Sequence, residues 1–199
     1  MKILFAALAY FVGAIPAGYI LFRASEKKDI RSFGSRATGA TNVLRLKGWK
    51  FAIPVALFDI LKGFLPAFLA LRIFADPALA GGCASLAVLG HCYPVYIGFK
   101  GGKGVATAAG AMFAIALGPA LLSLAVFIIT VVLARYVSLG SILAALLFPL
   151  FLRFFHAPLL IIGLSLPILF IILLRHAGNI RRLVAGTERK FGRKTEPSE

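Results

Sequence analysis

Long apolar runs separated by short polar stretches dominate this chain, and such runs predict membrane-spanning helices. Only Gly118 and Pro119 divide the run at 105–117 from the run at 120–134, so one kinked helix over 105–134 is an alternative to two helices. With no internal repeat, we expect a single all-α domain over 1–199 with a disordered tail after about residue 193. The seven runs cover residues 3–22, 51–74, 79–99, 105–117, 120–134, 138–152 and 158–174.

The distribution of charge favours seven membrane crossings over six. With seven crossings, 18 of the 22 Lys and Arg residues fall on one side of the membrane, in 23–50, 100–103, 135 and 175–199. Merging the fourth and fifth runs would place the tail and its seven basic residues on the other side, against the positive-inside rule. We therefore predict an integral membrane protein with seven transmembrane helices, a periplasmic N-terminus and a cytoplasmic C-terminus.

Composition agrees with this class of protein. The chain is 60% hydrophobic with a net charge of +15, and its basic residues form blocks between the apolar runs. They therefore mark a cytoplasmic face, and we expect no binding of nucleic acid. The first run has no small-residue cleavage site after it, so we expect a transmembrane helix and not a removed signal peptide.

A glycine-rich turn joins two of the apolar runs and reads Lys-Gly-Gly-Lys-Gly over residues 100–104. Its glycines let backbone N–H groups approach a ligand, and Lys103 adds a cation among them, which predicts a phosphate site at a membrane boundary. A tight turn with two interfacial lysines is the alternative. A nucleotide P-loop is excluded, because Ile97 stands where that motif needs a glycine. The glycines expected to contact phosphate are Gly101, Gly102 and Gly104.

The first predicted cytoplasmic loop is also rich in glycine and hydrogen-bond donors between Gly34 and Arg45. Backbone and hydroxyl donors in such a loop predict an anion-binding nest, and Arg45 can clamp an oxyanion through two parallel hydrogen bonds. A basic surface loop that binds lipid headgroups is the alternative. The candidate contacts are Gly34, Ser35, Thr38, Gly39, Thr41 and Asn42.

The last apolar run leads into a third polar segment. His176 and Asn179 are three residues apart and Arg175 and Asn179 four apart, so one helix edge presents three donors. For the arginines, a positive-inside flank explains the sequence as well as a site does. Glu188 stands within a basic stretch, and we interpret it as a salt-bridge partner and not as a catalytic base.

Ionisable residues inside apolar runs are functional candidates by default. Asp59 and Lys62 lie one helical turn apart and can neutralise each other, so we favour a structural or orienting role for this pair. His91 is either a proton carrier or a hydrogen-bonded structural histidine. The three histidines are scattered and lack acidic neighbours, so we expect no metal site and no cofactor.

These motifs together resemble the acyl-phosphate:glycerol-3-phosphate acyltransferase family of bacterial inner membranes (PlsY). The most specific blocks are Gly-Ala-Thr-Asn-Val-Leu-Arg at 39–45 and the segment from Gly90 to Thr107. Further matches lie at 13–19, 58–63 and 175–180, so the resemblance covers nearly the whole chain. It implies a seven-helix fold whose active site opens to the cytoplasmic side of the cell inner membrane.

The resemblance also implies a reaction and a set of residues. A fatty acyl group would move from acyl-phosphate to the 1-hydroxyl of glycerol-3-phosphate, with no obligatory protein partner and with membrane lipid around the enzyme. The chain departs from the family at Arg36 and Ala37, where the family usually has Gly and Asn. By carry-over, the catalytic or substrate-binding residues are Ser35, Arg45, Lys103, His176 and Asn179.

The residues themselves suit this chemistry. Acyl-phosphate is already activated, so the enzyme must collect two anions, align the hydroxyl with the carbonyl and stabilise developing charge. No His-x-x-x-x-Asp arrangement of acyl-CoA-dependent enzymes is present, because Tyr96 follows His91 at that spacing. We therefore expect the substrate's own phosphate to accept the hydroxyl proton. A transporter or channel for a phosphorylated anion is the main alternative, and a lipid-binding scaffold is another.

Overall fold

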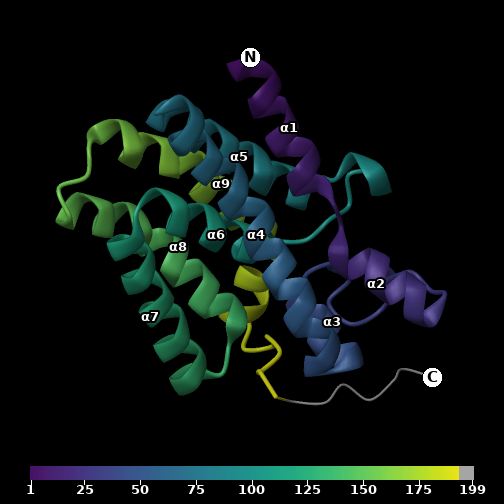
Figure 1. The fold of residues 1–199 in the computed structure, drawn as a ribbon. Coiled ribbons are helices and arrows are strands. Elements are labelled where there is room, and N and C mark those ends of the chain that lie inside the picture. The colour runs from purple at the N-terminus through teal and green to yellow at the C-terminus, as the bar shows by residue number, and fades with distance from the viewer. Residues whose placement is uncertain (193–199) are drawn as a thin grey trace.

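The computed structural model describes residues 1–192, and within them the fold is entirely helical (Figure 1). The tail expected to be disordered after about residue 193 lies outside the described residues. The α-helices are α1 (Lys2–Ala14), α2 (Ala17–Glu26), α3 (Ala40–Lys47), α4 (Trp49–Phe74), α5 (Pro77–Cys92), α6 (Val105–Ile115), α7 (Leu117–Ala134), α8 (Val137–Phe154) and α9 (Leu159–Val184), with short 3-10 helices at Ile30–Ser32 and Val95–Ile97.

Six helical segments within the described chain, with α1 and α2 counted together as Lys2–Glu26, are long and apolar enough to cross a membrane. This confirms the predicted class of integral membrane protein. The predicted run at 105–117 forms α6, which has only 11 residues and is too short to count among them. A break at Ala116 separates α6 from α7, so the prediction of two helices in place of one kinked helix is confirmed. Pro119 is tolerated in the first turn of α7, where N–H groups have no helical partner.

The first apolar run was predicted as one helix, and this prediction is wrong. It breaks at Ile15 and Pro16 into α1 and α2, which turns away from the axis of α1 in Figure 1. Proline lacks an N–H group and disfavours helical backbone in the residue before it, and Ile15 is accordingly extended. The Ile15 carbonyl instead accepts a hydrogen bond from Lys62 Nζ at 2.9 Å.

Small residues allow α6 to pack closely along α4. A Cβ at Gly63 would overlap the backbone of Thr107, and a Cβ at Gly110 would overlap the backbone of Ile60. Close backbone approach of this kind is how membrane helices associate, since lipid provides no hydrophobic driving force between them. This contact fixes the position of α6, and with it the glycine turn that precedes it.

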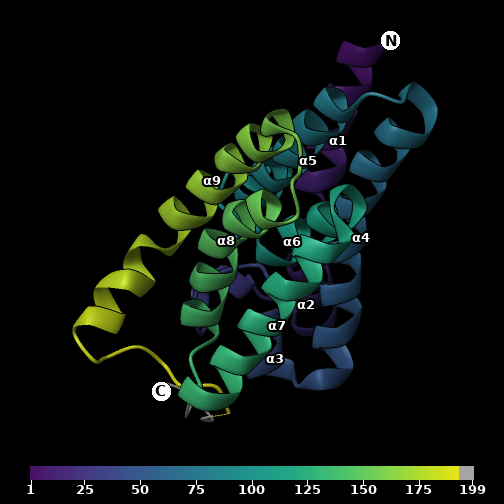
Figure 2. The same ribbon diagram turned by 90° about the vertical axis from the view of Figure 1, so that its left-hand side faces the viewer.

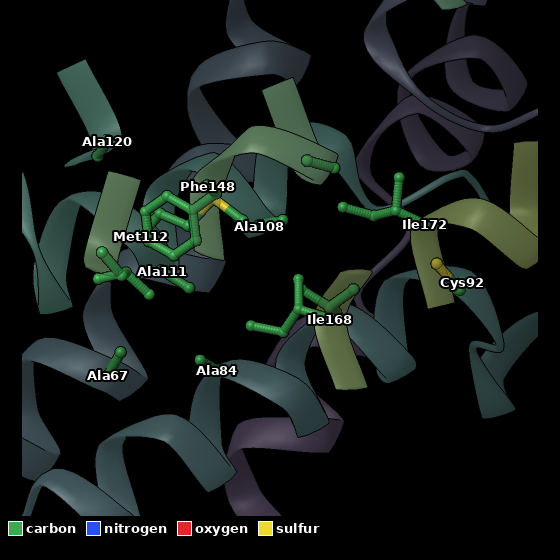
Figure 3. Packing of buried hydrophobic residues seen from close by; sticks show 13 residues of the cluster. Ala67, Ala84, Cys92, Ala108, Ala111, Met112, Ala120, Phe148, Ile168 and Ile172 are labelled. Atoms are coloured by element: carbon green, nitrogen blue, oxygen red, sulfur yellow. The ribbon is translucent and has the colours of Figure 1, made fainter. Parts of the chain in front are cut away.

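A hydrophobic cluster fills the bundle beyond the glycine turn (Figure 3). Met112 of α6 and Phe148 of α8 lie at its centre, and alanines of α4, α5 and α6 pack around them. Ile168 and Ile172 complete it from α9. The cluster closes one half of the bundle.

The three polar segments of interest meet at the other half. Figures 1 and 2 show α3, the end of α7, the start of α8 and the end of α9 gathered at the end of the molecule opposite the start of α1. Contacts join these segments: Phe191 donates its N–H to the Arg135 carbonyl, and its ring packs edge-on against Trp49. The fold therefore brings the start of α4, the α7–α8 turn and the chain after α9 together.

Candidate active site

One cavity of about 360 Å³ lies between α3, α4, α6, α7, α8 and α9. The five residues predicted to be catalytic come from the loop before α3, from α3, from the glycine turn and from α9. All five line this one cavity: Ser35, Arg45, Lys103, His176 and Asn179. Residues up to 144 positions apart in sequence are thus brought together on one wall, as the predicted site requires.

The residues predicted to bind phosphate divide into two groups. Gly39, Thr41, Asn42 and Gly104 line the cavity, and Gly34 lines a cleft that adjoins it through Ser35 and Arg45. The other three do not face the cavity. Thr38 is buried with its carbonyl against Gly18, and Gly101 and Gly102 are buried against His91.

Two cations in the cavity wall lack a protein partner. Within residues 1–192, neither Arg45 nor Lys103 makes a side-chain hydrogen bond or an ion pair. Burial lowers the pKa of Lys103 to about 8, opposed by the nearby Glu188 and assisted by Arg45. Burial also lowers the pKa of Arg45, as does Arg189. An anion bound between Arg45 and Lys103 would offset the free-energy cost of removing both charges from water.

Two helix N-termini face the same cavity. Ala40 and Thr41 begin α3, and Val105 and Ala106 begin α6, and all four line the cavity. The first N–H groups of a helix have no helical partner, and the helix dipole adds positive potential there. Anions are bound at such ends. Gly104 enters α6 with φ +80, a conformation that glycine adopts without strain.

The Asn42 amide supports the loop before α3. Its Oδ1 accepts the Ser35 N–H at 2.8 Å, and its Nδ2 donates to the carbonyls of Phe33 and Ala37 at 3.2 and 2.9 Å. The amide therefore holds Ser35 in place, although it was predicted to contact phosphate. Gly34 has φ +58, and a Cβ there would overlap Asn42 Oδ1, so both shape and conformation call for glycine.

Arg36 and Ala37 stand where the resemblance leads us to expect Gly and Asn, and the loop keeps a tight turn with them. Arg36 has φ +59, the left-handed conformation that glycine adopts most readily. Its N–H donates to the Phe33 carbonyl at 3.0 Å, and Asn42 binds the carbonyl of Ala37. The Arg36 side chain is exposed and lines clefts outside the cavity. The loop thus keeps its turn with arginine in place of glycine.

We expect Asn42→Ala to lower the free energy of unfolding by about 1–3 kcal/mol, because it leaves partly buried N–H and C=O groups of the loop without partners. Thermal unfolding of the purified protein in detergent measures this. Thr41→Ala is the control, since the Thr41 hydroxyl makes no hydrogen bond within the described chain. Equal melting temperatures for the two variants would contradict the supporting role of Asn42.

The two residues on α9 are oriented differently. His176 Nδ1 lies 2.8 Å from the Ile172 carbonyl, and because a carbonyl only accepts, Nδ1 carries the proton in this hydrogen bond. Nε2 is then an acceptor. Arg175, which was assigned to the positive-inside flank, does not line the cavity. Its Nε and Nη2 donate to the carbonyls of Gly102 and Gly101 at 2.9 and 3.1 Å.

Glu188 is a salt-bridge partner, as predicted. Its Oε2 lies 2.8 Å from Arg182 Nε, and its Oε1 accepts from Asn179 Nδ2 at 2.7 Å and from Ser138 Oγ at 2.8 Å. Burial raises the pKa of the Glu188 carboxyl, but the hydrogen bonds from Asn179, Ser138 and Arg182 outweigh it and hold the pKa below its usual value. Glu188 therefore fixes the Asn179 amide at the cavity wall and is not free to act as a base.

Asp59 and Lys62 form the predicted ion pair, with Lys62 Nζ 2.7 Å from Asp59 Oδ1 and both side chains buried. Asp59 and His91 line the cavity as well. No group of three or more His, Cys, Asp or Glu side chains in residues 1–192 is arranged to hold a metal ion.

The rest of the cavity wall is largely apolar, although Ser123 and Ser141 also line it. Ala109, Phe113, Leu124, Phe127 and Ala144 line it between α6, α7 and α8. A basic end with unsatisfied N–H groups and an apolar end suit a molecule with an anionic head and a hydrocarbon tail.

Sequence reasoning missed two contributors to the site. Ser138 at the start of α8 lies in a run that was assigned only to the membrane, and no local pattern distinguishes it. Arg175 was assigned to topology alone. Its position one helical turn before Asn179 was the available signal of a role in the site. The carbonyls that it binds, of Gly102 and Gly101, lie 73 and 74 residues away in sequence.

Fold and site together define a helical integral membrane protein with a cavity lined by the cations Arg45 and Lys103 and by many apolar side chains. The family profile described as "Glycerol-3-phosphate acyltransferase" matches residues 3–186. A glycerol-3-phosphate acyltransferase of Geobacter sulfurreducens is 46% identical over 191 residues, covering 96% of this chain and 97% of the relative. One of Fusobacterium nucleatum is 40% identical over 190 residues, covering 94% and 96%. The chain belongs to the glycerol-3-phosphate acyltransferase family.

Solved structures agree with this assignment. The crystal structure of PlsY (YgiH), an integral membrane glycerol 3-phosphate acyltransferase, in its glycerol 3-phosphate form has a TM-score of 0.92 at 40% identity. The match covers 96% of each chain. The lysophosphatidic acid form has a TM-score of 0.89, with 96% of this chain and 95% of that chain covered.

Proposed function

We propose that this protein transfers a fatty acyl group from acyl-phosphate to the 1-hydroxyl of glycerol-3-phosphate, giving lysophosphatidate and phosphate as the first step of phospholipid synthesis. The observation that carries the proposal is the pair of cations Arg45 and Lys103, which have no side-chain partner within residues 1–192, in the wall of a cavity that is otherwise largely apolar. The solved relative has forms with glycerol 3-phosphate and with lysophosphatidic acid, and the latter is a product of the proposed reaction.

The chemistry follows from the positions of the donors. The 1-hydroxyl oxygen attacks the acyl carbonyl carbon, the bond from that carbon to the phosphate oxygen breaks, and phosphate leaves. Lys103 and the N-terminus of α6 stabilise the negative charge that develops on the leaving oxygen. Arg45 and Ser35 hold the phosphate of the other substrate, and His176 Nε2 accepts a hydrogen bond from the hydroxyl and so orients it.

The hydroxyl proton passes to the leaving phosphate in this proposal. Both carboxylates in the cavity wall are engaged elsewhere, Asp59 with Lys62 and Glu188 with Arg182. A carboxylate held in an ion pair is a weak base. The leaving phosphate is also adjacent to the reacting hydroxyl, and it accepts the proton while His176 Nε2 orients the hydroxyl.

We further propose that the protein lies in a bacterial inner membrane with the cavity open to the cytoplasm. Most of the basic residues lie in three segments that gather at one end of the bundle: 23–50, the turn at 135 and 175–192. The positive-inside rule places this end in the cytoplasm. The short helix α6 is then the seventh crossing, and its turn lies inside the membrane where surrounding helices cover the irregular backbone.

Donor choice tests the proposed function. We expect purified protein with glycerol-3-phosphate to form lysophosphatidate from acyl-phosphate, and little or none from acyl-CoA, because the cavity has no place for a bulky nucleotide. Product formation from radiolabelled glycerol-3-phosphate, with each donor in turn, measures this. Comparable rates with the two donors would refute the proposed donor.

A transporter for a phosphorylated anion is the main alternative. The hydrophobic cluster around Met112, Phe148 and Ile168 argues against it, because these buried side chains pack beyond the basic part of the cavity and offer an anion no hydrogen bond. Flux of glycerol-3-phosphate into sealed vesicles without an acyl donor would favour that alternative.

Activity is expected to fall as the pH rises through about 8, where Lys103 loses its proton. A protonated ammonium attracts the anionic substrates below this pH, and the neutral amine does not above it. The fall should be seen in kcat/KM, which reports the free enzyme. In Lys103→Arg this fall should be absent, since arginine stays protonated. The same fall in both proteins would assign it to another group.

A further inference from the structure

Two buried ionisable residues in the cavity wall have no part in the chemistry proposed above. Asp59 of α4 is 2% exposed and His91 of α5 is 6% exposed. Their side chains meet between the two helices, with His91 Nδ1 3.5 Å from Asp59 Oδ1. A histidine oriented by a carboxylate is a common form of general base, so the geometry of its other nitrogen decides its role.

That other nitrogen is covered by the glycine turn. A Cβ at Gly102 would overlap His91 Nε2, so the imidazole lies directly against this glycine. Gly102 also donates its N–H to the His91 carbonyl at 3.1 Å. Nε2 therefore lies against the backbone of the turn, at the wall of the cavity that His91 also lines.

Arg175 holds the turn from another direction. Its guanidinium donates to the carbonyls of Gly101 and Gly102 and lies 5.2 Å from the centre of the Tyr93 ring. The turn is thus held between the His91 imidazole and the Arg175 guanidinium. Lys103 follows directly in the chain.

The support behind His91 is itself fixed. Asp59 pairs with Lys62, and Lys62 Nζ donates to the Ile15 carbonyl where α1 ends. Buried charges persist only when they are paired and hydrogen-bonded, and such networks allow little movement. The break in α1 is thereby linked through α4 and α5 to the glycine turn.

We propose that Asp59 and His91 are positioning residues that hold the glycine turn, and through it Lys103 and the N-terminus of α6, against the substrates. This inference rests on the proposed function, because it explains how that site is assembled. A displacement of about 1 Å can reduce turnover by about 10²-fold, so a rigid support for Lys103 matters to rate.

The overlap between Gly102 and the His91 ring provides the test. We expect Gly102→Ala to lower kcat/KM at least about 10-fold, because its methyl group pushes the turn away from the ring. His91→Ala removes the ring and makes room for that methyl group. The double variant should therefore be as active as His91→Ala alone. Losses that multiply in the double variant would overturn the proposal.

Gly101→Ala is the matched control. Its Cβ would meet the backbone carbonyl of His91 and the Pro94 ring, and neither is removed by His91→Ala. The loss caused by Gly101→Ala should persist in the His91→Ala background. Relief of both glycine variants would mean that His91→Ala merely loosens the region, and it would also overturn the proposal.

A second measurement does not depend on turnover. Amide hydrogen exchange at residues 101–104 should be faster in His91→Ala than in wild type, with unchanged exchange in α7 and α8. Should His91→Ala fail to fold, His91→Gln serves in its place with the same expected result. Unchanged exchange at the turn would refute the positioning role. A wild-type protein without acyltransferase activity would refute the proposed function and leave this measurement valid.

Discussion

Replacing Lys103 by alanine is expected to lower kcat/KM by at least ~10²-fold, the scale on which one preorganised electrostatic donor acts. Lys103 carries the point charge inside the glycine turn, next to the N-terminus of α6, and within the described chain nothing pairs with it. Its burial means that the charge acts in a medium poor in water, where it stabilises developing negative charge more strongly. Initial rates with acyl-phosphate and glycerol-3-phosphate, each varied in turn, measure the effect.

Lys100→Ala is the matched control for this variant. Lys100 stands three residues earlier in the same segment, but its side chain is exposed and does not line the cavity. We expect a much smaller loss than for Lys103→Ala. Near wild-type activity in a folded Lys103→Ala protein would show that the turn is not the anion site.

Arg45→Lys is expected to lower kcat/KM by about 10–100-fold although the positive charge is kept. Hydrogen bonds to charged groups contribute about 1.5–3 kcal/mol, and lysine cannot reproduce the planar, two-pronged contact of a guanidinium with an oxyanion. The Arg45 side chain lines the cavity from α3 and has no protein partner among residues 1–192, so its donors are available to substrate. A rise in KM for the anionic substrates should account for most of the loss.

The control is Lys47→Arg, the reverse exchange on the same helix. Lys47 pairs with Glu26 and does not line the cavity, so this variant should retain wild-type kinetics. Equal kinetics for Arg45→Lys and wild type would remove the anion clamp from the proposed mechanism and leave Lys103 as the sole cation of the site.

The sequence by itself determined the class of protein, and the resemblance to a family predicted the residues of the site. Hydropathy located the long helices because a span must be apolar over its whole length. Glycines beside Lys103, and hydroxyls beside Arg45, indicated anion binding because these residue types are rare together for any other local reason. The five predicted catalytic residues accordingly line one cavity.

Only the tertiary structure decided how those residues are held. Asn42 was expected to contact phosphate, but its amide binds the loop around Ser35. Arg175 was assigned to the positive-inside flank, but its guanidinium also binds the carbonyls of the glycine turn. A helical spacing tells which residues share a face and not which neighbour will satisfy each donor.

The break in the first helix shows the same limit. One helix was expected across Pro16, but the helix breaks there, and the Ile15 carbonyl accepts hydrogen bonds from the Ala17 N–H at 3.1 Å and from Lys62 Nζ, 47 residues away in sequence. Periodicity and composition report what each segment requires: an apolar neighbour, a hydrogen-bond partner or an opposite charge. The partner itself comes from whichever segment the fold places beside it, and that choice is made by packing over the whole chain.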